Sequence, residues 1–191
     1  ERFVARHREW AERRSREFTL QAPHALERRP AAIELQLLGK RWHVTYVAGA
    51  RNSASEDGEG MLTVRTMDAT DRHVGQALLP WLGRLAAEQL GERLDALSLE
   101  AGIDYSRMLL RRQRTRWGSC SSQGTISLNL CLMFQRPEVV RYLLIHELCH
   151  RRHMNHSQRF WGLVESLEPR WRELDAELLR GWQNVPAWVF P

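Results

Sequence analysis

The segment His146-Glu147-Leu148-Cys149-His150 constrains this chain more than any other, because it places two histidines and a carboxylate at helical spacing. The apolar run 139–145 precedes it and favours a buried helix. Side chains four residues apart lie on one helix face, roughly 5–6 Å apart at their bases. His146 and His150 can therefore direct a ring nitrogen to one Zn²⁺. Glu147 is turned away from that face, where it can reach a metal-bound water as a general base.

A third metal ligand has to come from outside this helix, because a catalytic zinc has three protein ligands and one open position. His156 follows His150 by six residues, between Asn155 and Ser157. Asn tolerates the backbone conformation that ends helices, and Ser is a favoured N-cap. We expect the chain to break at Asn155 and restart at Ser157, which would bring His156 back to the metal. The alternatives that the residues leave open are His153, Glu165 and Glu168.

The alternative to a metal site is a chance H-E-x-x-H pattern in a solvated helix. Three features favour the metal: the apolar run before the motif, a further histidine at usable spacing, and the signal for a helix restart. We therefore expect a Zn²⁺ cofactor held by His146, His150 and His156, with Glu147 as the catalytic base. His153 and Arg116 are candidates for a second donor to a developing oxyanion.

Composition favours a soluble globular protein of one domain. The 191 residues are 43% hydrophobic and 27% charged, with a formal net charge of +5. The three cysteines are odd in number and form no C-x-x-C, which argues against a disulfide framework and suits a reducing cytoplasm. No apolar run approaches the roughly 18 residues of a membrane span, and no signal-peptide pattern is visible. We expect a cytoplasmic protein with no membrane partner.

The order of patterned segments predicts an α+β fold with a small, mostly antiparallel sheet. We expect a helix over 1–17, then a connector over 19–32, and then a hairpin of Ile33–Leu37 and Trp42–Val47. A mobile polar loop over 49–60 and a third strand over Met61–Arg65 come next. A long helix follows from Asp71 to about Ala101, and Gly102 ends it. Ser106–Arg112 and Thr125–Asn129 follow as strands. Helices after His156 complete the chain, and its apolar tail 185–191 either packs on the surface or is exposed.

Two segments allow a functional and a structural interpretation. The strand Thr125–Asn129 either pairs with an extended peptide as an exposed sheet edge, which is our hypothesis, or lies inside the sheet. The loop Arg116–Ser122 is expected to be a structural clasp, and Gly118 and Gly124 bracket a tight loop in this region. Its alternative is that Cys120 ligates the metal.

A basic run beside Trp117 raises the possibility of nucleic-acid binding, and its members are Arg107, Arg111, Arg112, Arg114 and Arg116. The run alternates with apolar residues, as a half-buried strand does. We therefore keep nucleic acid as an alternative partner beside a protein or peptide substrate. A third class is a non-catalytic, zinc-stabilised scaffold. Glu147 argues against it, because a structural metal site has no use for a base.

Several motifs together resemble the YgjP-like bacterial zinc metallopeptidase family, which is related to the SprT-like and WLM proteases. They are Arg116-Trp117-Gly118-Ser119-Cys120-Ser121, then Gly124-x-Ile126-x-Leu128-Asn129, Pro137, the H-E-x-x-H segment, and Asn155-His156-Ser157-x-x-Phe160-Trp161. The match is specific over roughly residues 71–180. His153 stands where metzincins have glycine, and no methionine follows His156, so we exclude a metzincin.

The resemblance implies a zincin-like fold and a zinc metallopeptidase that hydrolyses peptide bonds through a zinc-bound water activated by Glu147. It also implies His146, His150 and His156 as the zinc ligands. We assign residues 71–191 to the zincin-like catalytic region. Residues 1–70 form an N-terminal helix and β-hairpin region of the same domain. The family usually has further strands ahead of this first helix, and the sequence begins at Glu1 rather than Met, so we expect this region to be truncated at its N-terminus.

Overall fold

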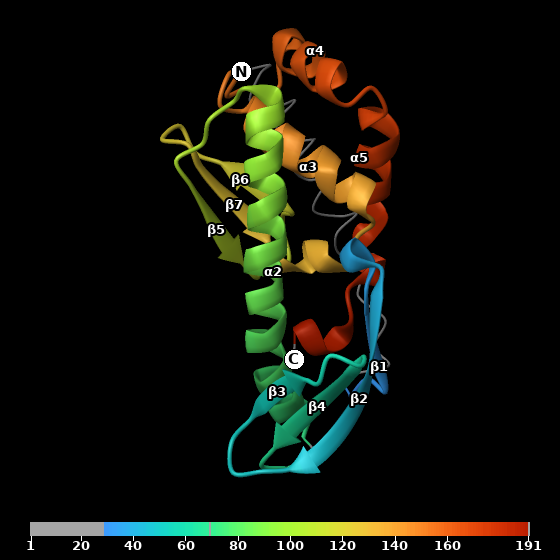
Figure 1. The fold of residues 1–191 in the computed structure, drawn as a ribbon. Helices are drawn as coiled ribbons and strands as arrows, with labels where there is room; N and C mark the ends of the chain where they lie inside the picture. Colours follow the sequence, from blue (N-terminus) through green and yellow to red (C-terminus); the bar gives the residue numbers. More distant parts are fainter. Residues whose placement is uncertain (1–28, 69, 191) are drawn as a thin grey trace, which may run out of the picture.

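A 31-residue helix, α2 (Asp71–Ala101), runs the length of the molecule in the computed structural model, which describes residues 29–68 and 70–190 (Figure 1). A four-stranded sheet lies at its N-terminal end and a three-stranded sheet lies beside its C-terminal half. Gly102 ends the helix with φ 62°, and the Ile103 N–H donates to the Ser98 carbonyl at 3.1 Å. The predicted bounds of this helix are confirmed. Pro80 lies within it.

The first sheet contains β1 (Ala32–Leu35), β2 (Lys40–Ala48), β3 (Ser53–Glu56) and β4 (Met61–Thr66) in the order β1-β2-β4-β3. The predicted hairpin is confirmed, since β1 and β2 pair antiparallel. Two expectations are wrong: β4 pairs parallel with β2, and a strand lies within the expected loop over 49–60. The apolar strand β4, with Leu62 and Val64 fully buried, takes the central place, whereas the polar β3 takes the edge.

The second sheet contains β5 (Arg107–Arg111), β6 (Gly118–Cys120) and β7 (Thr125–Asn129) in the order β5-β7-β6. The strand Thr125–Asn129 is thus interior, and the hypothesis that it is an exposed edge is wrong. Its Ile126 and Leu128 are fully buried, which explains why both of its edges are covered. Part of the expected clasp loop, Gly118–Cys120, forms the edge strand.

Three helices follow: α3 (Pro137–Cys149), α4 (Gln158–Leu167) and α5 (Trp171–Arg180). Short 3₁₀ turns complete the described elements: η1 (Gln36–Leu38), η2 (Leu130–Phe134), η3 (Gly181–Asn184) and η4 (Ala187–Val189). The C-terminal tail packs, because Trp188 and Val189 are fully buried. Arg112 and Arg114 donate to the carbonyls of Val189 and Phe190, each at 3.2 Å.

One hydrophobic cluster joins both sheets to the helices, and the edge-to-face contact of Trp42 with Trp81 at 5.4 Å belongs to it. The mixed α+β fold class is therefore confirmed, while the division at residue 70 stays a prediction. The helix expected over 1–17, and the connector as far as residue 28, lie outside the described residues. Among residues 29–68 and 70–190, no helix has both the length and the apolar character that crossing a membrane requires.

Candidate metal centre

The helix α3 carries the H-E-x-x-H segment into the interior. Pro137 occupies its first turn, where a missing N–H costs nothing, and Glu138 supplies a negative charge near the N-terminus. The apolar run that follows is buried almost completely, so the rotation of the helix is set by its core-facing side chains. His146 and His150 consequently share one face, with ring centroids 5.0 Å apart.

The structure brings His146, His150 and His156 together, with one ring nitrogen of each within 4.8 Å of the others. The Nε2 atoms of His146 and His156 are 3.1 Å apart. Such a set of imidazole nitrogens suits a zinc ion with an open fourth position. The residues present therefore fit the metal that the motif predicts, although their role as ligands stays a prediction.

The chain reaches His156 by a different route from the one expected. α3 already ends at Cys149, and the next residues form a turn in which the Arg151 N–H donates to the Leu148 carbonyl at 2.8 Å. No residue other than glycine has a positive φ in the described ranges, so Asn155 does not end the helix in the left-handed conformation. The restart is as predicted: Ser157 is the N-cap of α4, and its hydroxyl accepts from the Phe160 N–H at 3.4 Å.

The alternative ligands lie outside the histidine group, which is the one such group of metal-binding side chains found in 29–68 and 70–190. Glu165 pairs with Arg172 at 2.7 Å, and Glu168 lies 3.8 Å from Arg141. Burial, together with the charge of Glu147, raises the pKa of the Cys120 thiol, which disfavours the thiolate that a metal would need.

His153, the remaining alternative ligand, contacts the histidine group through its backbone carbonyl. Its carbonyl oxygen lies 3.2 Å from Nδ1 of His150, which can donate to it. That bond leaves Nε2 of His150 as the unprotonated nitrogen, as a metal ligand requires. Burial lowers the pKa of His150, which also favours the neutral ring.

Glu147 is buried beside the histidines, with only 4% of its surface exposed. Burial raises the pKa of this carboxyl to about 8, while the positive charge of Arg116 opposes the shift. Its Oε2 atom makes no hydrogen bond among the described residues. Buried carboxylate oxygens are normally paired, so an unpaired one at this position points to a partner beyond residues 29–68 and 70–190.

Aromatic rings surround the third histidine, a role that the sequence analysis did not predict. The ring of His156 stacks on Trp161 at 5.5 Å, and Trp161 stacks on Trp171 at 4.2 Å. Phe160 contacts all three histidine rings, with centroid distances of 5.0, 4.6 and 4.8 Å. The spacing of Phe160 and Trp161 directly after His156 was the available signal for this role.

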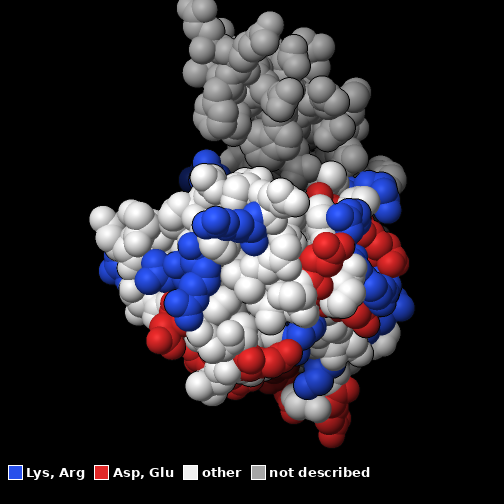
Figure 2. All heavy atoms as spheres, turned by 90° about the horizontal axis from the view of Figure 1, so that it is seen from above, with Lys and Arg blue, Asp and Glu red and all other residues white. Residues whose placement is uncertain are grey.

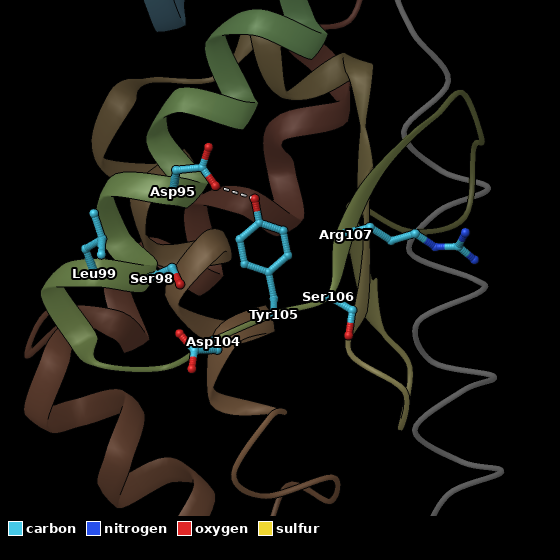
Figure 3. Close-up of a pocket in the computed structure, with 7 residues that line it drawn as sticks. All are labelled: Asp95, Ser98, Leu99, Asp104, Tyr105, Ser106 and Arg107. Carbon is cyan, nitrogen blue, oxygen red and sulfur yellow. Dashed lines mark hydrogen bonds between the residues drawn. The ribbon is translucent and has the colours of Figure 1, made fainter.

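An open pocket lies elsewhere, at the junction of α2 and β5, and Figure 3 shows the residues around it. Tyr105 extends across it to Asp95, to which its hydroxyl donates a hydrogen bond. Burial and the Asp95 carboxylate raise the pKa of Tyr105 to about 12. None of the three clustered histidines lines this pocket, so it is separate from the candidate metal centre.

Two solved structures are similar to about half of this chain. No curated protein matched the chain. The crystal structure of the metallopeptidase zymogen abylysin of Pyrococcus abyssi is similar at 26% identity, over 47% of this chain and 91% of that one, with a TM-score of 0.44. The crystal structure of the metallopeptidase zymogen jannalysin of Methanocaldococcus jannaschii is similar at 17% identity. The match covers 48% of this chain and 94% of that one, with a TM-score of 0.43.

A family model gives the assignment directly. The model of the YgjP-like metallopeptidase domain matches residues 1–180, which is nearly the whole chain. The resemblance predicted from the motifs is thus confirmed. The chain belongs to the YgjP-like family of metallopeptidase domains.

Proposed function

We propose that this metallopeptidase uses Zn²⁺ held by His146, His150 and His156 to hydrolyse peptide bonds in a protein or peptide substrate. The observation that carries the proposal is the convergence of three ring nitrogens within 4.8 Å beside a buried carboxylate with an unpaired oxygen. A structural zinc site would need a fourth protein ligand and no base. Here the side chain next to the histidines is Glu147, which suits hydrolysis.

Glu147 carries the proton in this proposal. A bound Zn²⁺ supplies Lewis acidity, polarising the scissile carbonyl and lowering the pKa of water toward about 7. Glu147 accepts a proton as the water oxygen bonds to the carbonyl carbon, and it delivers that proton to the amine nitrogen as the C–N bond breaks. Its buried position, which raises its pKa to about 8, is suited to holding a proton between these two steps.

We further propose that β6, rather than β7, offers the edge to which an extended substrate pairs. In the β6–β7 ladder, the Trp117 carbonyl accepts from the Asn129 N–H, and the Ser121 N–H donates to the Thr125 carbonyl, each at 2.9 Å. Because antiparallel strands alternate in this way, Gly118 and Cys120 direct their backbone groups away from β7. Gly118 also lies against Glu147, so a peptide on this edge would pass beside the proposed base.

Metal content measured on purified variants tests the proposal. Wild type should bind about one Zn²⁺ per chain, and His156→Ala should lose most of it, because two imidazoles remain of a three-ligand site. His153→Ala is the matched control and should keep its zinc, since only its backbone carbonyl contacts His150. Full zinc in His156→Ala would contradict the ligand assignment.

A second variant separates the base from the metal. Glu147→Gln should keep its zinc and lose about 10²–10⁴-fold in kcat, the usual contribution of a positioned acid–base group. Full activity in a zinc-loaded Glu147→Gln protein would remove Glu147 from the mechanism and leave the metal site intact.

The nucleic-acid alternative has less support. Arg112 and Arg114 bind the C-terminal tail, and Arg107 donates to the Thr125 hydroxyl at 3.2 Å. Seen from the end of the molecule at which α4 lies, the Lys and Arg side chains of the described residues form separate patches beside acidic ones on the visible face (Figure 2). Nucleic-acid binding through these arginines would weaken steeply with ionic strength, which a salt titration measures.

We place this activity in the cytoplasm. All three cysteines, Cys120, Cys131 and Cys149, are free thiols, as expected for a reducing compartment. Burial raises the pKa of the Cys149 thiol to about 12, so this residue acts as a small core side chain and not as a nucleophile.

A further inference from the structure

We propose that Tyr142 and Asp175 position the ring of His146 and determine which of its nitrogens faces the metal. The inference rests on the proposed zinc site and adds to it a pair of residues that do not touch the metal. Tyr142 lies one helical turn before His146 on α3, and it is only 1% exposed. Asp175 comes from α5, 33 residues away in the sequence.

The two contacts form a chain from the carboxylate to the imidazole. The Tyr142 hydroxyl donates to Oδ1 of Asp175 at 2.9 Å, and the Tyr142 hydroxyl oxygen lies 3.4 Å from Nδ1 of His146. The rings of Tyr142 and His146 meet edge to face, with centroids 5.9 Å apart. The phenol thus contacts the histidine both through its ring and through its oxygen.

The direction of the hydrogen bonds follows from the chemistry of the groups. An ionised carboxylate can only accept, so the single Tyr142 proton points to Asp175. The phenol oxygen then presents a lone pair to His146, and Nδ1 must carry the proton between them. The lone pair of the ring is left on Nε2, which is the nitrogen that lies 3.1 Å from Nε2 of His156. The pair therefore selects the tautomer that a metal needs.

The tautomer of the second proposed ligand, His150, is selected by a backbone group instead of a side chain. His150 has the backbone carbonyl of His153 opposite its Nδ1 atom, at 3.2 Å. His146 lies one turn after Tyr142 on α3, and the Tyr142 hydroxyl oxygen is 3.4 Å from its Nδ1 atom. The Tyr142 hydroxyl of the same helix takes this place, and Asp175 of α5 orients it. α5 thereby becomes part of the metal centre.

Two substitutions test the pair without changing its volume. Tyr142→Phe removes the acceptor, and zinc affinity should fall about 10–100-fold, as it does when partners of metal ligands are lost. Asp175→Asn leaves an amide that can donate to the phenol and turn its proton toward His146. That reversal favours the wrong tautomer, so zinc affinity should fall here as well. Affinity is measured by competition with a chromophoric chelator at fixed pH.

The tautomer itself is a readout that a merely structural role would not move. Nitrogen-15 NMR of the zinc-free protein should show His146 protonated at Nδ1 in wild type and shifted toward protonation at Nε2 in both variants. Tyr105→Phe is the matched control, because it removes the hydroxyl from another Tyr–Asp pair, one that lies away from the histidines. It should change neither zinc affinity nor the His146 signals.

The outcomes separate this inference from the proposed function. A wild-type chain that binds no zinc would overturn the proposed function and this role with it. A wild-type chain that binds zinc, with Tyr142→Phe and Asp175→Asn unchanged in both affinity and tautomer, would overturn only the role of the pair. Lowered affinity and a shifted tautomer in the variants, with an unchanged Tyr105→Phe control, would establish it.

Discussion

Gly118 lies so close to Glu147 that a Cβ atom built on the glycine would be 2.6 Å from Oε1 of the carboxylate and 3.0 Å from its Cδ. Contacts under about 3 Å are not tolerated by real side chains, so one of the two residues would have to move. The edge strand β6 and the helix α3 therefore approach each other at the proposed base. The absence of a side chain on Gly118 leaves room for the carboxylate that we propose as the base.

Gly118→Ala should displace Glu147 and lower kcat/KM by about 10²-fold, because a shift of about 1 Å in a catalytic group costs that much. Zinc content should stay at the wild-type level, since the atoms nearest to the added methyl group belong to Glu147 and not to a histidine. Steady-state cleavage of a peptide, with metal analysis of the same preparation, measures both.

Gly162→Ala is the control for this substitution. It makes the same chemical change on α4, where a new Cβ meets nothing within 4 Å. A helical glycine replaced by alanine should raise the free energy of unfolding by up to about 1 kcal/mol and leave activity unchanged. Equal activity of Gly118→Ala and wild type would mean that Glu147 has room to move without loss.

The sequence predicted the parts of this centre that depend on local spacing. The i, i+4 histidines, the N-cap at Ser157 and the end of α2 at Gly102 follow from short-range rules, and the structure has each of them. The closeness of Gly118 to Glu147 could not be predicted, because it depends on how a strand packs against a helix 29 residues later. The contact between Tyr142 and Asp175 is of the same kind.

The errors in strand pairing have a related cause. Alternation identified β4 and β7 as strands but does not state their neighbours, so β4 was expected in an antiparallel sheet and β7 at an edge. Burial distinguishes these strands, since β4 has Leu62 and Val64 and β7 has Ile126 and Leu128 fully buried, whereas no residue of the edge strands β3, β5 and β6 is buried. A polar segment such as Ser53–Glu56 can still pair as an edge strand, which explains the strand that was expected to be a loop.

Cys120→Pro should impair cleavage more than folding if β6 is the substrate edge. The N–H lost in this variant points away from β7, so the ladder between the strands stays complete. KM should rise, because one backbone hydrogen bond to the substrate is removed. Kinetics and thermal unfolding are measured on the same protein.

Two further substitutions control for the proline. Cys120→Ala removes the thiol and keeps the N–H, so it should cleave normally and retain zinc, as a non-ligand does. Ser119→Pro removes an N–H that faces Ser127 on β7, and it should destabilise the sheet itself. Similar KM values for Cys120→Pro and Cys120→Ala would rule out pairing at this edge.

Ser157→Ala should lower the free energy of unfolding by about 1 kcal/mol, the usual contribution of a serine N-cap. The hydroxyl accepts from the Phe160 N–H at the start of α4. Because His156 immediately precedes this cap, fraying of the first turn should also weaken zinc binding. Ser166→Ala, on the exposed side of the same helix, is the control, and denaturant unfolding with and without zinc is the measurement. Identical unfolding of the two variants would contradict the role of the cap.

Trp161→Leu should weaken zinc binding by up to about tenfold, because the aromatic stack that holds His156 contributes at most about 1.5 kcal/mol. His156 is an exposed residue outside the helices, and the ring of Trp161 lies against it at 5.5 Å with an interplanar angle of 26°. Trp171→Leu removes the outer ring of the stack, which lies on Trp161 at 4.2 Å on the side away from His156 in the order His156–Trp161–Trp171. Both variants should lower the free energy of unfolding, but only Trp161→Leu should change zinc affinity substantially. Equal zinc affinities in the two variants would mean that the stack stabilises α4 and α5 without positioning the third ligand.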